Sequence, residues 1–156
     1  MVAEDDPVAD EVQALLTRHL AYAHEHSPPE HVHALDVSGL VDERVTFFGV
    51  RERDGGALLG IGALRHLDDT HAEIKSMHTA AEARGRGVAR VLVERLLSVA
   101  RARGYARVSL ETGTDDAFRP ARRLYESFGF AECDPFADYT RNTYSVCMTL
   151  PLDGLP

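Results

Sequence analysis

The chain has 156 residues, of which 44% are hydrophobic and 27% charged, a composition typical of one globular domain with a single core. We therefore expect one domain over residues 1–156. The formal net charge of −8 disfavours nonspecific binding to nucleic acid or to an anionic membrane, and it favours cationic partners. No stretch has about 18 consecutive apolar residues, and the first residues lack a basic region followed by an apolar run. We expect a cytoplasmic protein.

The first predicted element is a helix that begins after Asp5, has Pro7 near its first turn and ends before Ser27. Apolar residues recur on one face at helical spacing: Val8, Val12, Leu15, Leu16 and Leu20. This face is expected to pack on the core.

A histidine-rich segment comes next and is the one candidate for a metal site. Its possible ligands are His24, His26, His31, His33 and Asp36, and imidazole suits zinc, copper or nickel. Two prolines separate the histidine pairs, and no helical or CxxC register brings four ligands together. We expect no metal here, and instead a solvated loop with a short helix at the edge of a substrate groove. Cys133 and Cys147 form no CxxC pair and are expected to be reduced thiols.

Three strands are predicted after this segment. Residues 44–51 and 57–64 are rich in β-branched, aromatic or other apolar side chains, and the sequence Asp-Gly-Gly at 54–56 is a strong turn between them. A second turn at 68–70 leads into a strand at 72–79. The three strands are expected to form an antiparallel meander.

Helices and strands alternate in the remainder of the chain. Apolar residues at helical spacing predict a helix that begins within 84–89 and ends near Gly104. A strand at 107–112 follows it, and the helical crossover implies that this strand lies parallel to the one before the helix. A helix from 115 to 128 and strands at 130–132 and 143–150 complete the pattern. The expected fold class is therefore α/β, with a mixed sheet covered by helices.

The strand-to-helix joint Arg84-Gly85-Arg86-Gly87-Val88-Ala89 has the features of an anion-binding loop. A helix N-terminus carries unpaired N–H groups and the positive end of the helix dipole, and glycine lets a phosphate approach the backbone closely. A P-loop is excluded because no Lys-Ser/Thr follows, and a Rossmann turn is excluded because its third glycine would be Arg90. What remains is the pattern Arg84-x-x-Gly87-x-Ala89.

This pattern resembles the acetyl-CoA pyrophosphate loop of the GNAT N-acetyltransferase superfamily, which reads Arg/Gln-x-x-Gly-x-Gly/Ala. A second stretch, from Ala121 through Leu124 and Tyr125 to Gly129 and Phe130, matches the superfamily's A-x-x-L-Y-x-x-x-G-F segment in every named position. The resemblance covers about residues 44–150. It implies a mostly antiparallel sheet with helices on both faces, a parallel strand pair splayed at the cofactor site, and acetyl-CoA as co-substrate without a metal.

The resemblance also implies catalytic roles. Tyr125 would protonate the leaving CoA thiolate, and Glu73 resembles the glutamate that acts as general base in the histone-acetylating branch. Glu111 and His78 are reserve bases. The alternative for Glu73 is a structural ion pair with Lys75, because the two side chains lie on the same face of one strand.

For the cofactor, the resemblance implies that a backbone N–H of Met77, His78 or Thr79 holds the acetyl carbonyl while the strand end pairs with pantetheine amides. The pyrophosphate would lie on the N–H groups of Arg84, Gly85, Arg86, Gly87, Val88 and Ala89. Phe118 and Arg122 would line the pantetheine or adenine, although Phe118 stands where the family often has asparagine.

These matches predict an N-acetyltransferase that moves the acetyl group of acetyl-CoA to an amine, in a small molecule or a peptide, by direct attack in a ternary complex. A noncatalytic acyl-CoA-binding or sensing module on the same fold is the alternative. The substrate side is expected at 24–36 and 135–144. No nucleic acid or membrane partner is expected, and a homodimer through the last strands is compatible with the family.

Overall fold

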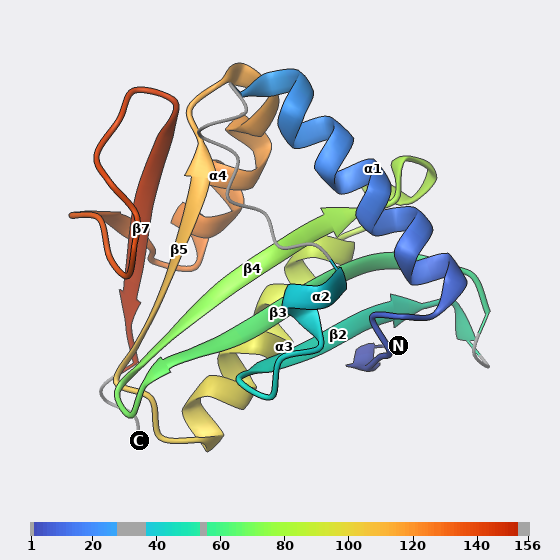
Figure 1. Ribbon diagram of the computed structural model, residues 1–156, viewed down its shortest axis with the longest axis horizontal. Helices are drawn as coiled ribbons and strands as arrows, with labels where there is room; N and C mark the ends of the chain where they lie inside the picture. The colour runs from blue at the N-terminus through green and yellow to red at the C-terminus, as the bar shows by residue number, and fades with distance from the viewer. Residues whose placement is uncertain (1, 28–36, 54–55, 153–156) are drawn as a thin grey trace.

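The computed structural model describes residues 2–27, 37–53 and 56–152 (Figure 1). A seven-stranded sheet lies at its centre, in the order β1-β2-β3-β4-β5-β7-β6, and all neighbouring strands are antiparallel except β4 and β5. The strands are β1 (Val2–Glu4), β2 (Val45–Arg51), β3 (Leu58–Asp68), β4 (His71–Thr79), β5 (Arg107–Gly113), β6 (Ala131–Cys133) and β7 (Ser145–Pro151). The predicted mixed sheet is confirmed.

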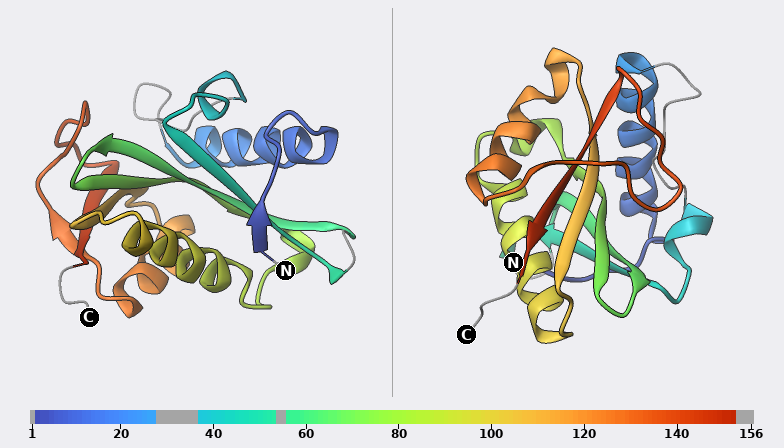
Figure 2. Two further views of the ribbon diagram at one scale, coloured as in Figure 1. Left: turned by 90° about the horizontal axis from the view of Figure 1, so that it is seen from below. Right: turned by 90° about the vertical axis from the view of Figure 1, so that its left-hand side faces the viewer.

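Helices cover both faces of this sheet, as predicted (Figure 2). The α-helices are α1 (Asp10–His26), α2 (Val37–Leu40), α3 (Val88–Ala102) and α4 (Arg119–Ser127), and short 3₁₀ turns occur at Ala81–Ala83 and Asp116–Phe118. The first two helices lie on one face, and α3 and α4 lie on the other (Figure 2).

Close packing of α3 on the sheet sets the position of its N-terminus. A Cβ atom on Gly60 in β3 would lie 2.6 Å from Cγ1 of Val88, the first residue of α3, so glycine is needed for this approach. Farther along the helix, Leu92 and Leu96 are fully buried, and each contributes about 1.5–3 kcal/mol by removing its side chain from water. The helix start is thereby held beside the end of β4.

The structure differs from several of the sequence-based boundaries. The predicted helix at 115–128 is a 3₁₀ turn followed by α4, which begins at Arg119, and β7 begins at Ser145 rather than at 143. The edge strand β1 was not expected, since three residues are too few to show an alternating pattern. The first helix begins at Asp10, because Asp5 pairs instead with Arg51 of β2 at 2.9 Å. Strand β3 continues to Asp68 rather than ending at residue 64. Part of the predicted 54–56 turn, residues 54–55, lies outside the described residues.

The sheet opens between β4 and β5, which confirms the predicted splayed pair. Parallel pairing runs from His71 opposite Arg107 to Ile74 opposite Leu110, and beyond these residues the strands diverge (Figure 1). The opening places a gap in the middle of the sheet rather than at its edge.

A β-bulge lies in β4 directly after this point. Lys75 pairs with Ala63 and His78 pairs with Ile61, so the two residues Ser76 and Met77 oppose the single residue Gly62. Ser76 has a φ of 58°, which lies in the left-handed region that non-glycine residues rarely adopt. Such strained positions cluster at functional sites.

Candidate active site

A cavity of about 140 Å³ lies where β4 and β5 separate. Its walls come from α1, β4, β5, α4 and the segment that connects β6 to β7. Among the side chains that line it are Glu73, Met77, Glu111, Phe118 and Tyr125, all of which the sequence singles out.

The bulge forms one wall of the cavity. It interrupts the ladder with β3 at Ser76 and Met77 and begins two residues after Ile74, the last residue of β4 that pairs with β5. The Ser76 hydroxyl is buried there and has no hydrogen-bond partner among the residues that the structure describes. In the described part of β4, this is the point where backbone groups can meet a ligand lying in the gap.

The arginine-glycine loop follows β4. Gly85 and Gly87 have φ values of 82° and 79°, and, apart from their chain neighbours, no described residue has an atom within 4 Å of a Cβ placed on either glycine. Gly87 is the N-cap of α3 and provides no side-chain cap. The N–H groups of Arg84 and Arg86 donate to the carbonyls of Ala81 and Ala83 at 3.4 Å each. The loop thus presents an open helix N-terminus beside a glycine backbone.

Arginine side chains surround this loop, and each has a partner in the protein. The Arg84 guanidinium lies 5.6 Å from the centre of the Tyr22 ring, and Arg86 pairs with Glu52 at 2.7 Å. Arg90 donates to Ser127 Oγ at 3.1 Å. In these contacts Arg84 and Arg90 reach residues of α1 and α4, and the charge of Arg86 is offset by the Glu52 carboxylate.

Tyr125 lies on α4 and lines the cavity while being only 6% exposed. Its ring contacts Phe130 with a centroid separation of 5.8 Å. Burial raises the pKa of the Tyr125 hydroxyl well above its usual value. The phenol is therefore neutral near pH 7, the form that can give a proton to a leaving group.

Phe118 and Arg122, the two residues predicted to line the pantetheine or adenine, have different surroundings. Phe118 lines the cavity and makes an edge-on contact with Tyr22 at 5.6 Å. Arg122 Nη1 donates to the carbonyls of Gly113 at 2.7 Å and Asp115 at 3.0 Å. Arg122 thus holds the connection between β5 and α4 in place.

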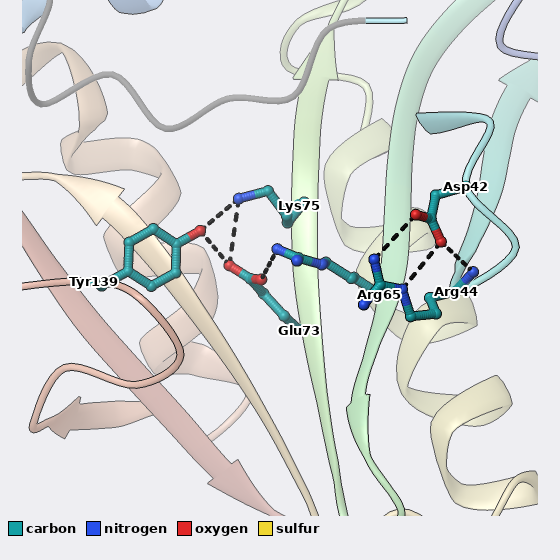
Figure 3. Close-up of polar contacts among 6 residues, drawn as sticks. All are labelled: Asp42, Arg44, Arg65, Glu73, Lys75 and Tyr139. Carbon is teal, nitrogen blue, oxygen red and sulfur yellow. Dashed lines mark hydrogen bonds and ion pairs between the residues drawn. The ribbon is translucent and has the colours of Figure 1, made fainter. Parts of the chain in front are cut away.

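Glu73 is at the centre of a buried polar cluster (Figure 3). Its Oε2 accepts a hydrogen bond from the Tyr139 hydroxyl at 2.5 Å and lies 3.4 Å from Lys75 Nζ. Its Oε1 lies 3.8 Å from Arg65 Nη1, and the whole side chain is 1% exposed. The predicted ion pair with Lys75 is observed, but it is part of a larger network.

Lys75 is the single lysine of the chain, and every other long cationic side chain is arginine. It is 8% exposed and lines the cavity. Its Nζ donates to the hydroxyl of Tyr139 and lies 5.2 Å from the centre of that ring. Burial and the neighbouring Glu73 carboxylate raise the pKa of Tyr139 well above its usual value.

Of the two reserve bases, Glu111 lines the cavity and His78 does not. His78 Nδ1 is 3.3 Å from Nδ1 of His19, and burial lowers the pKa of both imidazoles to about 4. Both rings are therefore neutral near pH 7. On β5, Glu111 accepts a hydrogen bond from Ser145 Oγ at 2.8 Å.

Sequence reasoning missed Tyr139 and His19 as site residues. Tyr139 falls inside the predicted substrate segment 135–144, but nothing in the spacing of that segment links it to Glu73. His19 belongs to the predicted first helix, and only the packing of α1 against β4 brings it to His78.

The described residues contain no group of three or more His, Cys, Asp or Glu placed to hold a metal. His26 instead lies 3.6 Å from Asp115, while His31, His33 and Asp36 fall outside the described residues. Cys133 and Cys147 are free thiols. No helix in the described ranges is long and apolar enough to cross a membrane.

Comparison with known proteins agrees with this geometry. The chain is 46% identical over 148 residues to YsnE of Bacillus subtilis, an uncharacterized N-acetyltransferase, with 95% of this chain and 97% of that protein covered. It is also 46% identical over 151 residues to YedL of Escherichia coli, which has the same description, with 97% and 94% covered.

Solved structures show the same fold. An aminoglycoside 6'-acetyltransferase type Ii superposes with a TM-score of 0.74 at 18% identity, covering 100% of this chain and 99% of that one. A GNAT family acetyltransferase from Elizabethkingia anophelis with acetyl-CoA bound gives 0.70 at 15% identity, with 97% of each chain covered. The family model "Acetyltransferase (GNAT) family" matches residues 9–130. This chain therefore belongs to the GNAT family of acetyltransferases.

Proposed function

We propose that the protein transfers the acetyl group of acetyl-CoA to an amine by direct attack within a ternary complex. The observation that carries the proposal is the gap between β4 and β5. It has the Ser76–Met77 bulge on one wall, Tyr125 on the other, and the open N-terminus of α3 beyond its end. A thioester, a carbonyl-binding backbone and a proton donor can meet in this arrangement.

In this proposal the cofactor lies along β4. Its pyrophosphate rests on backbone N–H groups of Gly85, Gly87, Val88 and Ala89, because those of Arg84 and Arg86 already donate to carbonyls within the turn. The pantetheine lies in the gap and pairs with β4 as an added strand would. The acetyl carbonyl then accepts a hydrogen bond from a backbone N–H in residues 77–79.

The chemistry follows from these positions. The neutral amine attacks the thioester carbon, so that an N–C bond forms and the C–S bond breaks, and Tyr125 gives its proton to the departing thiolate. The proton lost by the amine goes to a carboxylate, for which Glu73 is the first candidate and Glu111 the second. His78, with a pKa of about 4, is a weaker base than a group matched to neutral pH.

Thermal unfolding with acetyl-CoA, CoA, NAD and a panel of divalent metals tests the binding half of the proposal. A ligand at about 100 times its dissociation constant adds about 2.7 kcal/mol to the free energy of unfolding. We expect a shift with the two CoA ligands alone. A shift with a metal and none with CoA would contradict the proposed cofactor site.

Thiol release from acetyl-CoA in the presence of amines tests the catalytic half. Spermidine, kanamycin and Nα-acetyl-lysine represent three acceptor classes that the acidic protein would attract. Release that depends on one of these amines supports the transferase. Tight acetyl-CoA binding without release, over a wider amine panel, would favour the noncatalytic acyl-CoA sensor instead.

A further inference from the structure

Glu73 is poorly placed to meet an incoming amine itself. Its side chain is 1% exposed, and its Oε2 already interacts with Tyr139 and Lys75. Arg65 lies beside the other oxygen, Oε1. Tyr139 lines the same cavity but is only partly buried, so it is the more accessible of the two side chains.

We propose that Tyr139 is a catalytic residue that passes the acceptor's proton to Glu73. The inference rests on the proposed function and adds a residue to it. It follows from the Tyr139 hydroxyl, which donates to Glu73 Oε2 at 2.5 Å (Figure 3) and belongs to the more exposed of these two cavity-lining side chains.

The direction of this hydrogen bond is fixed by its partners. A lysine ammonium can only donate and a carboxylate can only accept. The Tyr139 oxygen therefore accepts from Lys75, and its own hydrogen must point to Glu73. Lys75 acts here as a positioning residue, because it orients the hydroxyl and neither gives nor takes a proton in the proposed step.

The proposed step balances in protons and electrons. As the amine nitrogen forms its bond to the carbonyl carbon, its N–H proton moves to the Tyr139 oxygen while the Tyr139 proton moves to Glu73 Oε2. Tyr139 is neutral before and after, and Glu73 ends as a carboxylic acid. Solvent later removes this proton and returns one to Tyr125, which has protonated the thiolate. The raised pKa of Tyr139 suits this role, since a tyrosinate is never required.

The charged groups found to act on Tyr139 within the described residues include a competing proton acceptor. Glu73 and Lys75 come from β4, Arg65 from β3 and Glu111 from β5. Glu111 also lines the cavity and is partly exposed, so it could take the proton directly. The experiment must therefore separate a route through Tyr139 from one through Glu111.

The Tyr139→Phe variant distinguishes the two routes. Its rate is measured with whichever of spermidine, kanamycin and Nα-acetyl-lysine gives the fastest thiol release in the wild type. We expect kcat to fall about 100-fold, the lower end of general acid–base effects, and KM for acetyl-CoA to change less than about threefold. The ring and its contact with Phe136 at 5.1 Å remain. Tyr105→Phe is the matched control: its hydroxyl contacts His66 outside the cavity, and we expect wild-type kcat.

Combining Tyr139→Phe with Glu73→Gln adds a readout that a purely structural role would not give. If both residues serve one route, the double variant is no slower than the slower single variant. Lys75→Met should also lower kcat, and Lys75→Arg should recover part of it because arginine can donate to the same hydroxyl.

Retention of more than about a third of kcat by Tyr139→Phe would overturn the inference and leave the proposed function intact, with Glu111 as the base. Multiplicative losses in the double variant would overturn it as well. A wild-type protein that releases no thiol with any amine would overturn the proposed function, and the relay with it.

Discussion

The proposed site has two sides that are built in different ways. The side proposed for the cofactor, the cofactor wall, is made of backbone: the Ser76–Met77 bulge, which lines the cavity, and, beyond the cavity, the glycines at 85 and 87 and the first turn of α3. The wall proposed for the acceptor is made of side chains, with Tyr139 brought from the β6–β7 connection to Glu73 and Lys75 on β4.

This difference explains why the family is evident from a few residues while the acceptor is not. A backbone-built site depends on local geometry, so a short glycine motif can specify it. A site built from side chains depends on which distant segments the fold brings together, and each of those segments can change independently. Substitutions on the two walls should therefore have separable effects.

The largest effect is expected on the acceptor wall. Glu73→Gln removes the proton acceptor and should lower kcat about 10²- to 10⁴-fold, while the affinity for acetyl-CoA stays near that of the wild type. Steady-state rates and titration calorimetry measure the two quantities. Glu111→Gln is the comparison variant, and a greater loss of kcat there than in Glu73→Gln would transfer the role to β5.

A comparable effect on the cofactor wall should appear in affinity rather than in rate constants. Gly87→Glu places a carboxylate beside the proposed pyrophosphate site and should weaken acetyl-CoA binding about 10²-fold or more, since like charges repel strongly when partly desolvated. Gly104→Glu is the matched control. Its φ is 84° and its surroundings are equally open, so both variants carry the same backbone strain. Equal affinities in the two variants would place the pyrophosphate elsewhere.

Tyr125→Phe should have a smaller effect on turnover. The variant keeps the buried ring and its contact with Phe130 but loses the proton for the thiolate. We expect kcat to fall about 10²-fold and the dissociation constant of acetyl-CoA to stay within a factor of about three. Rapid-quench measurement of the acetyl-transfer step checks this, and an unchanged rate would remove the proposed acid role.

The smallest expected effect is a pH dependence of the free energy of unfolding, and it involves His19 of α1, which lines the cavity. The folded-state pKa of His19, about 4, lies below its unfolded value near 6.5, so the unfolded chain binds more protons in this window. Stability should therefore fall as pH decreases from about 6.5 to 4, by about 1–3 kcal/mol after allowance for partial solvent screening. Urea unfolding at pH 7 and pH 4.5 measures it, and His19→Asn should flatten the dependence. An equal slope in both proteins would argue against the neutral, buried His19.

The sequence predicts most of the sheet and the strand, loop and helix of the cofactor wall, because these depend on local patterns, but it does not predict the Ser76–Met77 bulge. Strand β4, the loop at 84–89 and helix α3 follow from periodicity and glycine placement. Strand β1 escaped prediction because only pairing with β2 makes its three residues a strand. Tyr139 escaped for a related reason: it lies 66 residues from Glu73 along the chain, and no spacing rule connects residues so far apart.

Only four residue pairs, from His71 opposite Arg107 to Ile74 opposite Leu110, join β4 to β5. The sheet is therefore two ladders, β1 to β4 and β5 to β6, fastened to each other at one end. Amide hydrogens near the open ends should exchange with solvent as two separate cooperative units in the unliganded protein. A ligand bound between the two ladders would contact both open ends and slow amide exchange in β4 and in β5. A ligand held only by the surface loop would slow exchange in β4 alone.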